Sequence, residues 1–155
     1  MVSITLNDDK EHVLSAQSEQ HWLRRAKELT AWTKLDKRRR KAKHTMTLES
    51  FTVDAELYPA LSLLRRLQIP TEFSCAGVSL LDDPEDHSLY AYITLHASDS
   101  ATRFVSFAMA FMKHRLLVTY EPARNRYDLS SFFIGHNRSF CLLMQRCAET
   151  YEPFI

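Results

Sequence analysis

The stretch that most constrains the fold is a helix that is apolar over most of its circumference. It is expected to run from a serine cap at Ser98 or Ser100 to a basic end near His114. A helix of this kind is buried, because it has no broad polar face to present to water. We therefore expect a sheet for it to pack against. Its apolar side chains are Phe104, Val105, Phe107, Ala108, Met109, Phe111 and Met112.

Segments with β-type patterns surround this helix, at residues 45–53, 71–77, 88–96, 116–120 and 126–134. The last two predict a hairpin. Amphipathic helices are expected at residues 18–33, 55–67 and 138–151. Asp54 is expected to cap the second of these, although Pro59 favours a start nearer Tyr58. Because pairs of strands are separated by helices, we predict an α+β fold: a two-layer sandwich in which helices pack on an antiparallel or mixed sheet.

Positive charge is concentrated near the N-terminus. Residues 1–45 contain eleven Lys or Arg against six Asp or Glu, a net charge of +5, whereas residues 46–155 contain nine against thirteen, a net charge of −4. We therefore predict a basic, helical N-terminal arm, residues 1–44, and a single α+β domain, residues 45–155. A basic arm on a mildly acidic body indicates an interaction segment.

The densest part of the arm is residues 34–44, where seven basic side chains accompany one acid. One interpretation is contact with the phosphate backbone of a nucleic acid, in which each neutralised phosphate releases a counterion. The other is a charged helix extension or linker that only water covers. The candidate nucleic-acid-binding residues are Lys34, Lys37, Arg38, Arg39, Arg40, Lys41 and Lys43.

The helix expected at residues 18–33 carries Trp22 and Trp32, and no Gly or Pro interrupts it. Its apolar face either joins the core or docks on a partner. The alternative function is therefore a non-catalytic regulatory or interaction protein that binds a partner protein, or forms a homo-oligomer, through this helix.

A corner of the expected sheet, residues 71–77, contains a cysteine and one of the two glycines of the chain. Alternation places Ser74 on the face opposite Thr71 and Cys75, and Gly77 is suited to a turn at positive φ. We take Ser74, Cys75 and Gly77 as candidate ligand-binding residues. Cys75 is also a candidate catalytic nucleophile, with a base chosen from His87, His96 and His136. The alternative is a small buried thiol.

Residues 135–139 form the second candidate site. Free N–H groups at a helix start, with Arg138 beside them, are suited to an anion, so His136 and Arg138 are further candidate ligand-binding residues. In the alternative interpretation, Asn137 only caps the helix and its two neighbours are solvated.

An acidic helix start at residues 53–54, an apolar helix, the motif T-x-F-S-C-x-G at residues 71–77 and a strand with Tyr-Ile follow one another along the chain. In this order they resemble a pattern in the tRNA wybutosine-synthesising methyltransferase family of the Taw3 type, over residues 53–95. Phe73, Ala76 and Val78 stand where that family has serine, serine and arginine, so the resemblance does not extend to methyl transfer from S-adenosylmethionine. It implies a ligand pocket at the corner and leaves the ligand open. Small bacterial and phage proteins of unknown function are similar at this segment.

Other classes are disfavoured. Two glycines among 155 residues leave no glycine-rich phosphate loop or dinucleotide fingerprint. The seven histidines are scattered without an H-E-x-x-H motif, so no metal site is predicted. Three cysteines without a C-x-x-C pair suit a reducing compartment, and no apolar run is long enough for a membrane span. We expect a cytoplasmic protein. The sequence indicates no cofactor and does not decide whether the protein is an enzyme.

Overall fold

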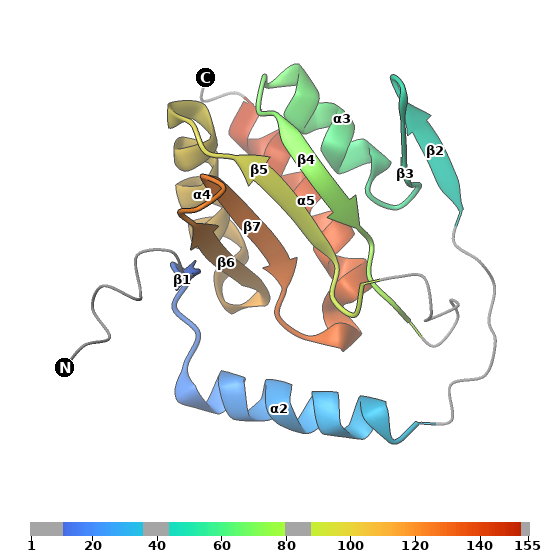
Figure 1. Ribbon diagram of the computed structural model, residues 1–155, viewed down its shortest axis with the longest axis vertical. Coiled ribbons are helices and arrows are strands. Elements are labelled where there is room, and N and C mark those ends of the chain that lie inside the picture. Colours follow the sequence, from blue (N-terminus) through green and yellow to red (C-terminus); the bar gives the residue numbers. More distant parts are fainter. Residues whose placement is uncertain (1–10, 36–43, 80–87, 153–155) are drawn as a thin grey trace.

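The computed structural model of the protein describes residues 11–35, 44–79 and 88–152. Within these residues the chain has an α+β fold in which helices cover one face of an antiparallel sheet (Figure 1). The predicted fold class is confirmed. The largely apolar helix, α4 (Asp99–Met112), begins at the Ser98 cap and packs against the sheet with Phe104, Val105 and Ala108 buried.

The main sheet has five strands, in the order β1 (His12–Val13), β6 (Leu116–Glu121), β7 (Arg126–Ser131), β5 (Tyr92–His96) and β4 (Thr71–Cys75). All neighbouring strands are antiparallel. In its middle, Ile93, Leu129 and Val118 lie side by side and are fully buried. A separate hairpin lies beside the edge strand β4 and consists of β2 (Thr45–Leu48) and β3 (Phe51–Asp54).

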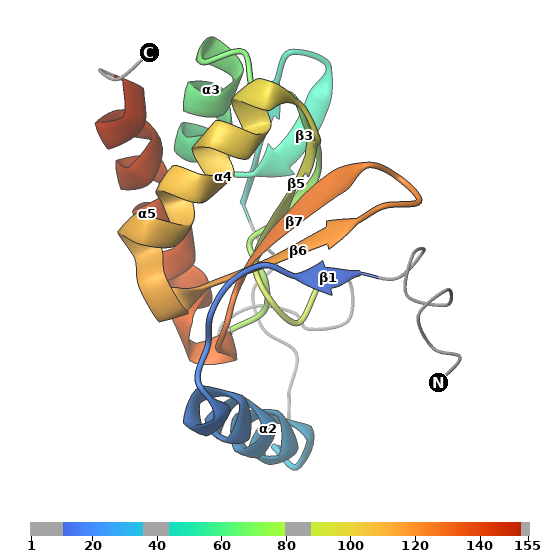
Figure 2. The same ribbon diagram turned by 90° about the vertical axis from the view of Figure 1, so that its left-hand side faces the viewer.

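Figure 2 shows that three helices form the second layer on one face of the sheet: α3 (Tyr58–Arg66), α4 and α5 (Asn137–Tyr151). Their inner side chains, among them Leu64, Phe104 and Met144, make the hydrophobic core with the sheet. Two short 3-10 turns, Lys113–Arg115 and Ile134–His136, connect helices and strands. No helix in the described residues is both long enough and apolar enough to cross a membrane.

Helix α2 (Glu19–Thr33) lies across the lower end of the domain, outside the helical layer (Figures 1 and 2). Ser18 caps it by accepting the His21 N–H at 3.1 Å. No side chain of α2 is fully buried. Because β1 joins the sheet before α2 begins, the segment that precedes the domain is not a helix alone. The division into an arm, residues 1–44, and a domain, residues 45–155, stays a prediction.

The segment expected as one strand at residues 45–53 is a hairpin. Glu49 adopts a positive φ of 56° and reverses the chain between β2 and β3. The expectation that Asp54 caps the next helix was also wrong, since Asp54 ends β3 and its carboxylate accepts the N–H of Ala76. Helix α3 begins at Tyr58, the later start that the following proline favours.

The strand expected at residues 88–96 begins only at Tyr92. Before it, the Ser88 hydroxyl donates to the Tyr90 carbonyl at 2.8 Å. In β4 the register shifts between Thr71 and Ser74. Such a bulge inserts an extra residue and reverses the alternation beyond it. Thr71 and Ser74 therefore share one face of β4, which corrects the expectation that they lie on opposite faces.

Candidate functional site

The two candidate ligand-binding stretches meet at the buried side chain of Asn137, which is 2% exposed. Its Oδ1 accepts the Ala91 N–H at 2.9 Å and the Ser131 hydroxyl at 2.6 Å. Its Nδ2 donates to the carbonyls of Val78 at 2.8 Å and Leu89 at 3.0 Å. These bonds use both donors and both acceptor sites of the amide. Asn137 therefore links the ends of three strands to the start of α5.

Gly77 is buried against this amide at a positive φ of 78°. A Cβ added there would lie 2.6 Å from the backbone nitrogen of Ala91 and would also collide with Asn137. Gly77 turns the chain at positive φ, as predicted. Its close contacts are with Ala91 and Asn137 of the same chain. The alternative interpretation, in which Asn137 only caps α5, is wrong, because His136 holds the cap position and the Asn137 side chain points inward.

Arg138, the anion-binding candidate, is already paired within the domain. It forms an ion pair with Glu56 and donates to the Ser79 hydroxyl at 3.2 Å. Its side chain is half exposed, so the pair lies at the surface. The free positive charge expected beside the start of α5 is thus partly neutralised.

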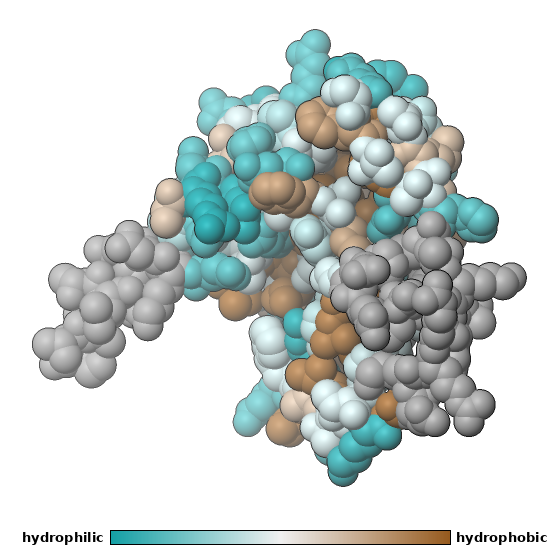
Figure 3. Space-filling view, turned by 45° about the vertical axis from the view of Figure 1, so that its right-hand side comes forward, coloured by the Kyte–Doolittle hydropathy of each residue, from teal (hydrophilic) through white to brown (hydrophobic). Residues whose placement is uncertain are grey.

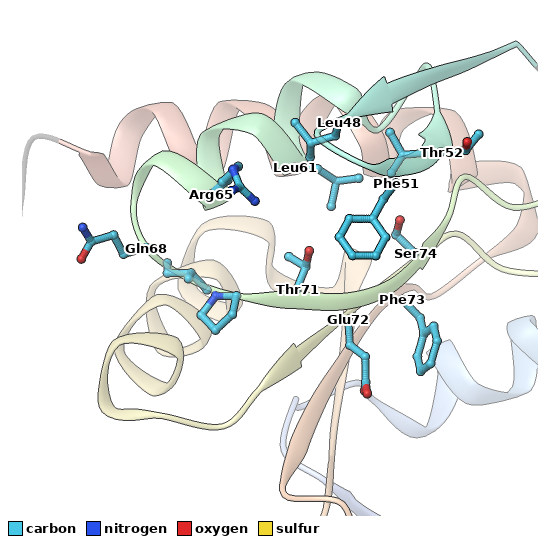
Figure 4. Close-up of a pocket in the computed structure, with 13 residues that line it drawn as sticks. Leu48, Phe51, Thr52, Leu61, Arg65, Gln68, Thr71, Glu72, Phe73 and Ser74 are labelled. Carbon is cyan, nitrogen blue, oxygen red and sulfur yellow. The ribbon is translucent and has the colours of Figure 1, made fainter.

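Ser74 lines a groove of about 670 Å³ between β4, α3 and the β2–β3 hairpin. In Figure 4, Thr71 and Ser74 point into the groove, toward Phe51 and Leu61, whereas Phe73 points away on the other side of β4. The bulge in β4 produces this arrangement. Of the predicted ligand-binding residues, Ser74 is the one that lines this groove.

The walls of the groove are largely apolar, and the Phe51 side chain is 68% exposed. The hydroxyls of Thr52, Thr71 and Ser74 add polar groups, and Arg65 lies at the rim in an ion pair with Glu49. The apolar lining consists of Leu48, Phe51, Val53, Leu61, Ile69 and Pro70.

Cys75 is half-buried on the other side of β4, opposite Tyr92 in the register. Its sulfur accepts the Gly77 N–H at 3.4 Å. Burial raises the pKa of the Tyr92 hydroxyl, and the neighbouring Cys75 is the second largest contribution in the same direction. His96 lies four residues along β5 from Tyr92, about 13 Å at the usual rise of a strand. His96 is therefore too far from Cys75 to act as its base. His87 lies outside the described residues.

Helix α2 is held to the domain by polar side chains spaced three or four residues apart. Arg25 donates to the Phe132 carbonyl at 2.6 Å and lies over the Tyr90 ring at 4.0 Å. Glu28 accepts the N–H groups of Ile134 at 2.6 Å and Gly135 at 2.9 Å. The docking row is His21, Arg25, Glu28 and Trp32, all half-buried. It covers a small cluster of buried side chains, Leu117, Phe132 and Phe133.

The other two sides of α2 are exposed. One row is apolar apart from its last residue and consists of Trp22, Ala26, Leu29 and Thr33. Of these, Trp22 also packs edge-on against Phe132 of the domain, with ring centroids 4.8 Å apart. The second row, called the basic row for its three cations, consists of Gln20, Arg24, Lys27, Ala31 and Lys34. Of these, Arg24 also lies over the Phe133 ring of the domain at 4.5 Å. Figure 3 shows hydrophobic side chains along α2 at the lower end of the molecule. Lys34 is the C-cap of α2, and the other six candidate nucleic-acid-binding residues lie outside the described residues.

Beneath α2 lies a cluster of histidine and arginine side chains that the sequence did not indicate. The rings of His21 and His114 stack with centroids 4.5 Å apart. Burial, and then nearby positive groups that include Arg115 and Arg24, lower the pKa of His114 and of His136. The Nδ1 atom of His136 is buried and has no hydrogen-bond partner among the described residues. The five groups come from three separate segments, so no local motif marks them.

The sheet face without helices carries a second cluster that the sequence did not reveal. Arg126 lies within ion-pair distance of Glu72 at 3.4 Å, Glu121 at 3.2 Å and Asp128 at 3.4 Å. Burial raises the pKa of Asp128, and Arg126 opposes that effect. Alternation within β7 indicates that Arg126 and Asp128 share a face of the sheet. Glu72 and Glu121 come from other strands, so only the arrangement of the strands in the sheet places them on that face.

Two further observations concern reactive groups. Cys147 is fully buried in α5, and burial raises the pKa of its thiol to about 12, so it is inert at neutral pH. Within the described ranges, no three His, Cys, Asp or Glu side chains are placed to hold a metal ion.

Comparison of the chain with known protein families, curated protein sequences and solved structures finds no match. The resemblance of residues 53–95 to the Taw3-type family stays a prediction.

Proposed function

We propose that the protein binds nucleic acid through the exposed basic row of α2 and the basic run that follows it. The observation that carries this proposal is the exposure of Lys27 and Lys34 on one row, while the docking row, together with Arg24 over the Phe133 ring, holds the helix to the domain. The helix that carries the basic row is therefore held in place by the docking row.

The length of the row favours a polymer over a small phosphorylated ligand. An α-helix rises 1.5 Å per residue, so Arg24 and Lys34 lie about 15 Å apart along α2. Duplex DNA carries one phosphate charge per about 1.7 Å of its axis, and a line of cations matches a line of phosphates. The basic run at residues 34–43 extends the charged stretch in sequence. The net charge of +5 on residues 1–45 supports the same assignment.

The two arginines of the cluster beneath α2, Arg24 and Arg115, add to this field. His21, His114 and His136 lie near Arg24 and Arg115, with Glu28 as the one carboxylate that acts on His136. A phosphate beside this cluster would favour the charged form of each histidine. The proposal assigns no phosphate contact to Gly77, which packs on Asn137.

A salt titration tests the proposal. The probes are a single-stranded RNA of about 20 nucleotides and a DNA duplex of about 20 base pairs, both labelled with fluorescein. Fluorescence anisotropy measures the binding constant at NaCl concentrations from about 25 to about 300 mM, roughly a tenfold range. The logarithm of the binding constant is expected to fall linearly with the logarithm of the salt concentration. In the variant Lys27→Gln/Lys34→Gln, the slope is expected to be shallower by about 0.7–0.9 for each phosphate that the variant no longer neutralises.

The matched control is Arg103→Gln/Arg146→Gln, which removes the same charge from exposed positions on α4 and α5. Its salt slope should equal that of the wild type. Absence of binding at 25 mM salt, a salt-independent affinity, or an equal loss in the control variant overturns the proposal, because each contradicts a phosphate contact localised on α2.

A second candidate function rests on the apolar row of α2. Trp22, Leu29 and the neighbouring Leu23 are 39%, 37% and 58% exposed. Trp22 is partly covered by Phe132, but leaving Leu23 and Leu29 in water forgoes the free energy of burying them. We propose that a second copy of the chain covers this row, because an antiparallel pair of α2 helices centred on Ala26 would place Leu23 of each copy beside Leu29 of the other. The two candidates use different rows of α2 and are tested separately.

A further inference from the structure

Strand β4 is an edge of the main sheet. It pairs with β5 on one side, and among the described residues no strand pairs with it on the other. Strand β3 lies alongside β4 but belongs to the separate hairpin. One contact fixes the distance between the two strands at one end: the Ala76 N–H donates to Asp54 Oδ2 at 2.7 Å. Beyond this contact the groove lined by Ser74 separates them.

The backbone N–H groups alternate in direction along β4 and the residue that follows it. The Phe73 N–H donates inward, to Thr94 Oγ1 of β5 at 2.7 Å, whereas the Ala76 N–H donates outward, to Asp54. Because the backbone groups of a strand alternate in direction, those of Ser74 point outward, like those of Ala76. The carboxylate of Asp54 thus occupies the position where an added strand would place a carbonyl, and the next outward position, at Ser74, lies in the groove.

The chemistry of the groove selects one kind of occupant. A purely apolar ligand, such as an acyl chain, would fill the space beside Phe51 and Leu61 but would bury the outward backbone groups of Ser74 without partners. An extended peptide supplies an acceptor and a donor at every second residue. Its side chains on one face would reach the apolar wall, and those on the other face would remain in water.

We propose that the groove binds an extended peptide segment of a partner protein, which adds to the sheet as a strand along β4 and carries an apolar side chain at every second residue. The peptide pairs with the backbone of Ser74 and places its apolar side chains against Phe51, Leu61 and Ile69. The site lies on the opposite edge of the sheet from β1 and does not involve the basic row of α2. The inference is therefore independent of nucleic-acid binding.

The test uses the full chain and a small set of fluorescein-labelled peptides. Each is an acetylated heptamer, Lys-X-Thr-X-Thr-X-Lys amide, in which X is Val, Leu or Phe. Anisotropy measures binding, and hydrogen exchange measures protection of the amides in residues 71–75. At least one peptide is expected to bind and to slow exchange at Ser74. The same peptide with N-methylated threonines is expected to bind roughly fivefold to tenfold more weakly, because its backbone N–H groups are lost.

Two variants at one position separate backbone pairing from apolar contact. Ser74→Pro removes the outward N–H at an edge strand, where proline is tolerated, and is expected to weaken peptide binding by a similar factor or more. Ser74→Ala keeps that N–H and should bind like the wild type. Circular dichroism and the midpoint of urea unfolding show whether both variants fold.

Several outcomes overturn the proposal. One is the absence of binding by every peptide. A second is equal binding of the methylated and unmethylated forms, which would show that the backbone of the strand does not pair. A third is binding of dodecanoate in the groove with no peptide binding, which would identify the groove as an acyl-chain site. Equal affinity of Ser74→Pro and Ser74→Ala, with both variants folded, contradicts the role of the Ser74 N–H.

Discussion

The side-chain amide of Asn137 occupies the space where a Cβ at position 77 would lie. The two residues are 60 positions apart in the sequence, and their contact joins the turn after β4 to the first turn of α5. We regard this contact as the structural basis of the corner that the sequence singled out. Several expectations about stability follow from it.

Gly77→Ala is expected to destabilise the domain. A non-glycine residue at positive φ costs about 1–2 kcal/mol, and the added methyl also displaces Asn137. The free energy of unfolding, measured by urea denaturation, should fall by at least this amount. Gly135→Ala is the control, because its Cβ would meet only Glu28 Oε2, at 3.3 Å. Equal stability of the two variants would contradict the assigned role of Gly77.

Asn137→Asp is expected to make stability depend on pH in a new way. The substitution replaces the Nδ2 donor by an oxygen that faces the carbonyls of Val78 and Leu89, and burial favours its protonated form. Its folded-state pKa is then raised above the unfolded value, so the variant loses stability as the pH rises. Relative to wild type, it should be more stable at pH 5 than at pH 7.5. The exposed substitution Asn125→Asp should show no such difference in urea titrations.

Glu28→Gln is expected to loosen α2. The carboxylate accepts two backbone N–H groups at the Ile134–His136 turn, and bonds of this charged kind are worth about 1.5–3 kcal/mol. A neutral amide still accepts but more weakly, so a loss of about 1 kcal/mol is expected. Hydrogen exchange should quicken in α2 and at Gly135, while β5 and β7 keep their protection. Glu149→Gln, on the exposed side of α5, is the matched change.

Stability is expected to decline as the pH falls below about 6.5, the unperturbed pKa of histidine. Burial and positive neighbours lower the pKa of His114 and of His136 in the folded state. The unfolded chain therefore binds more protons in this range, and its population rises on acidification. Urea midpoints at pH 7.5 and pH 5.5 measure the effect. His114→Gln/His136→Gln should flatten the difference, and an unchanged pH profile would argue against this cause.

Leu29→Lys is expected to reduce self-association if the apolar row of α2 pairs with a second copy. It places a charge on the row without removing a residue of the docking row. Sedimentation velocity should show the wild type as a dimer and this variant as a monomer. Leu142→Lys, which changes an apolar residue 50% exposed on α5, should leave the dimer intact. A monomeric wild type would exclude the second candidate function.

The sequence was sufficient for much of the architecture because local signals agreed with one another. The serine cap at Ser98, the apolar circumference of α4 and the alternation along β5 each predicted an element that the structure contains. The order of the elements predicted an antiparallel or mixed sheet, and the structure contains an antiparallel one. The hairpin at residues 45–53 was missed because its turn uses Glu49 at positive φ, a conformation that composition does not signal.

The candidate site was predictable only in part. The sequence singled out Ser74 and Gly77, but the bulge that aims Ser74 into the groove depends on Thr94, whose hydroxyl bonds the Phe73 N–H from the neighbouring strand. The role of Asn137 was hidden for a similar reason. An asparagine at a helix start is normally a cap, and only the folded chain shows Val78 and Leu89 beside its amide. Long-range contacts determined both cases.

The chain enters the sheet at one edge, through β1, and continues after α2 to the hairpin beside the opposite edge at β4. Helix α2 is thus tethered at both ends. When it leaves Phe132 and Phe133, it stays at an effective concentration on the order of millimolar, because both tethers keep it near the domain. A partner that occupies the surface under α2 must compete with this local concentration, and its affinity will depend on the length of chain between β1 and β2.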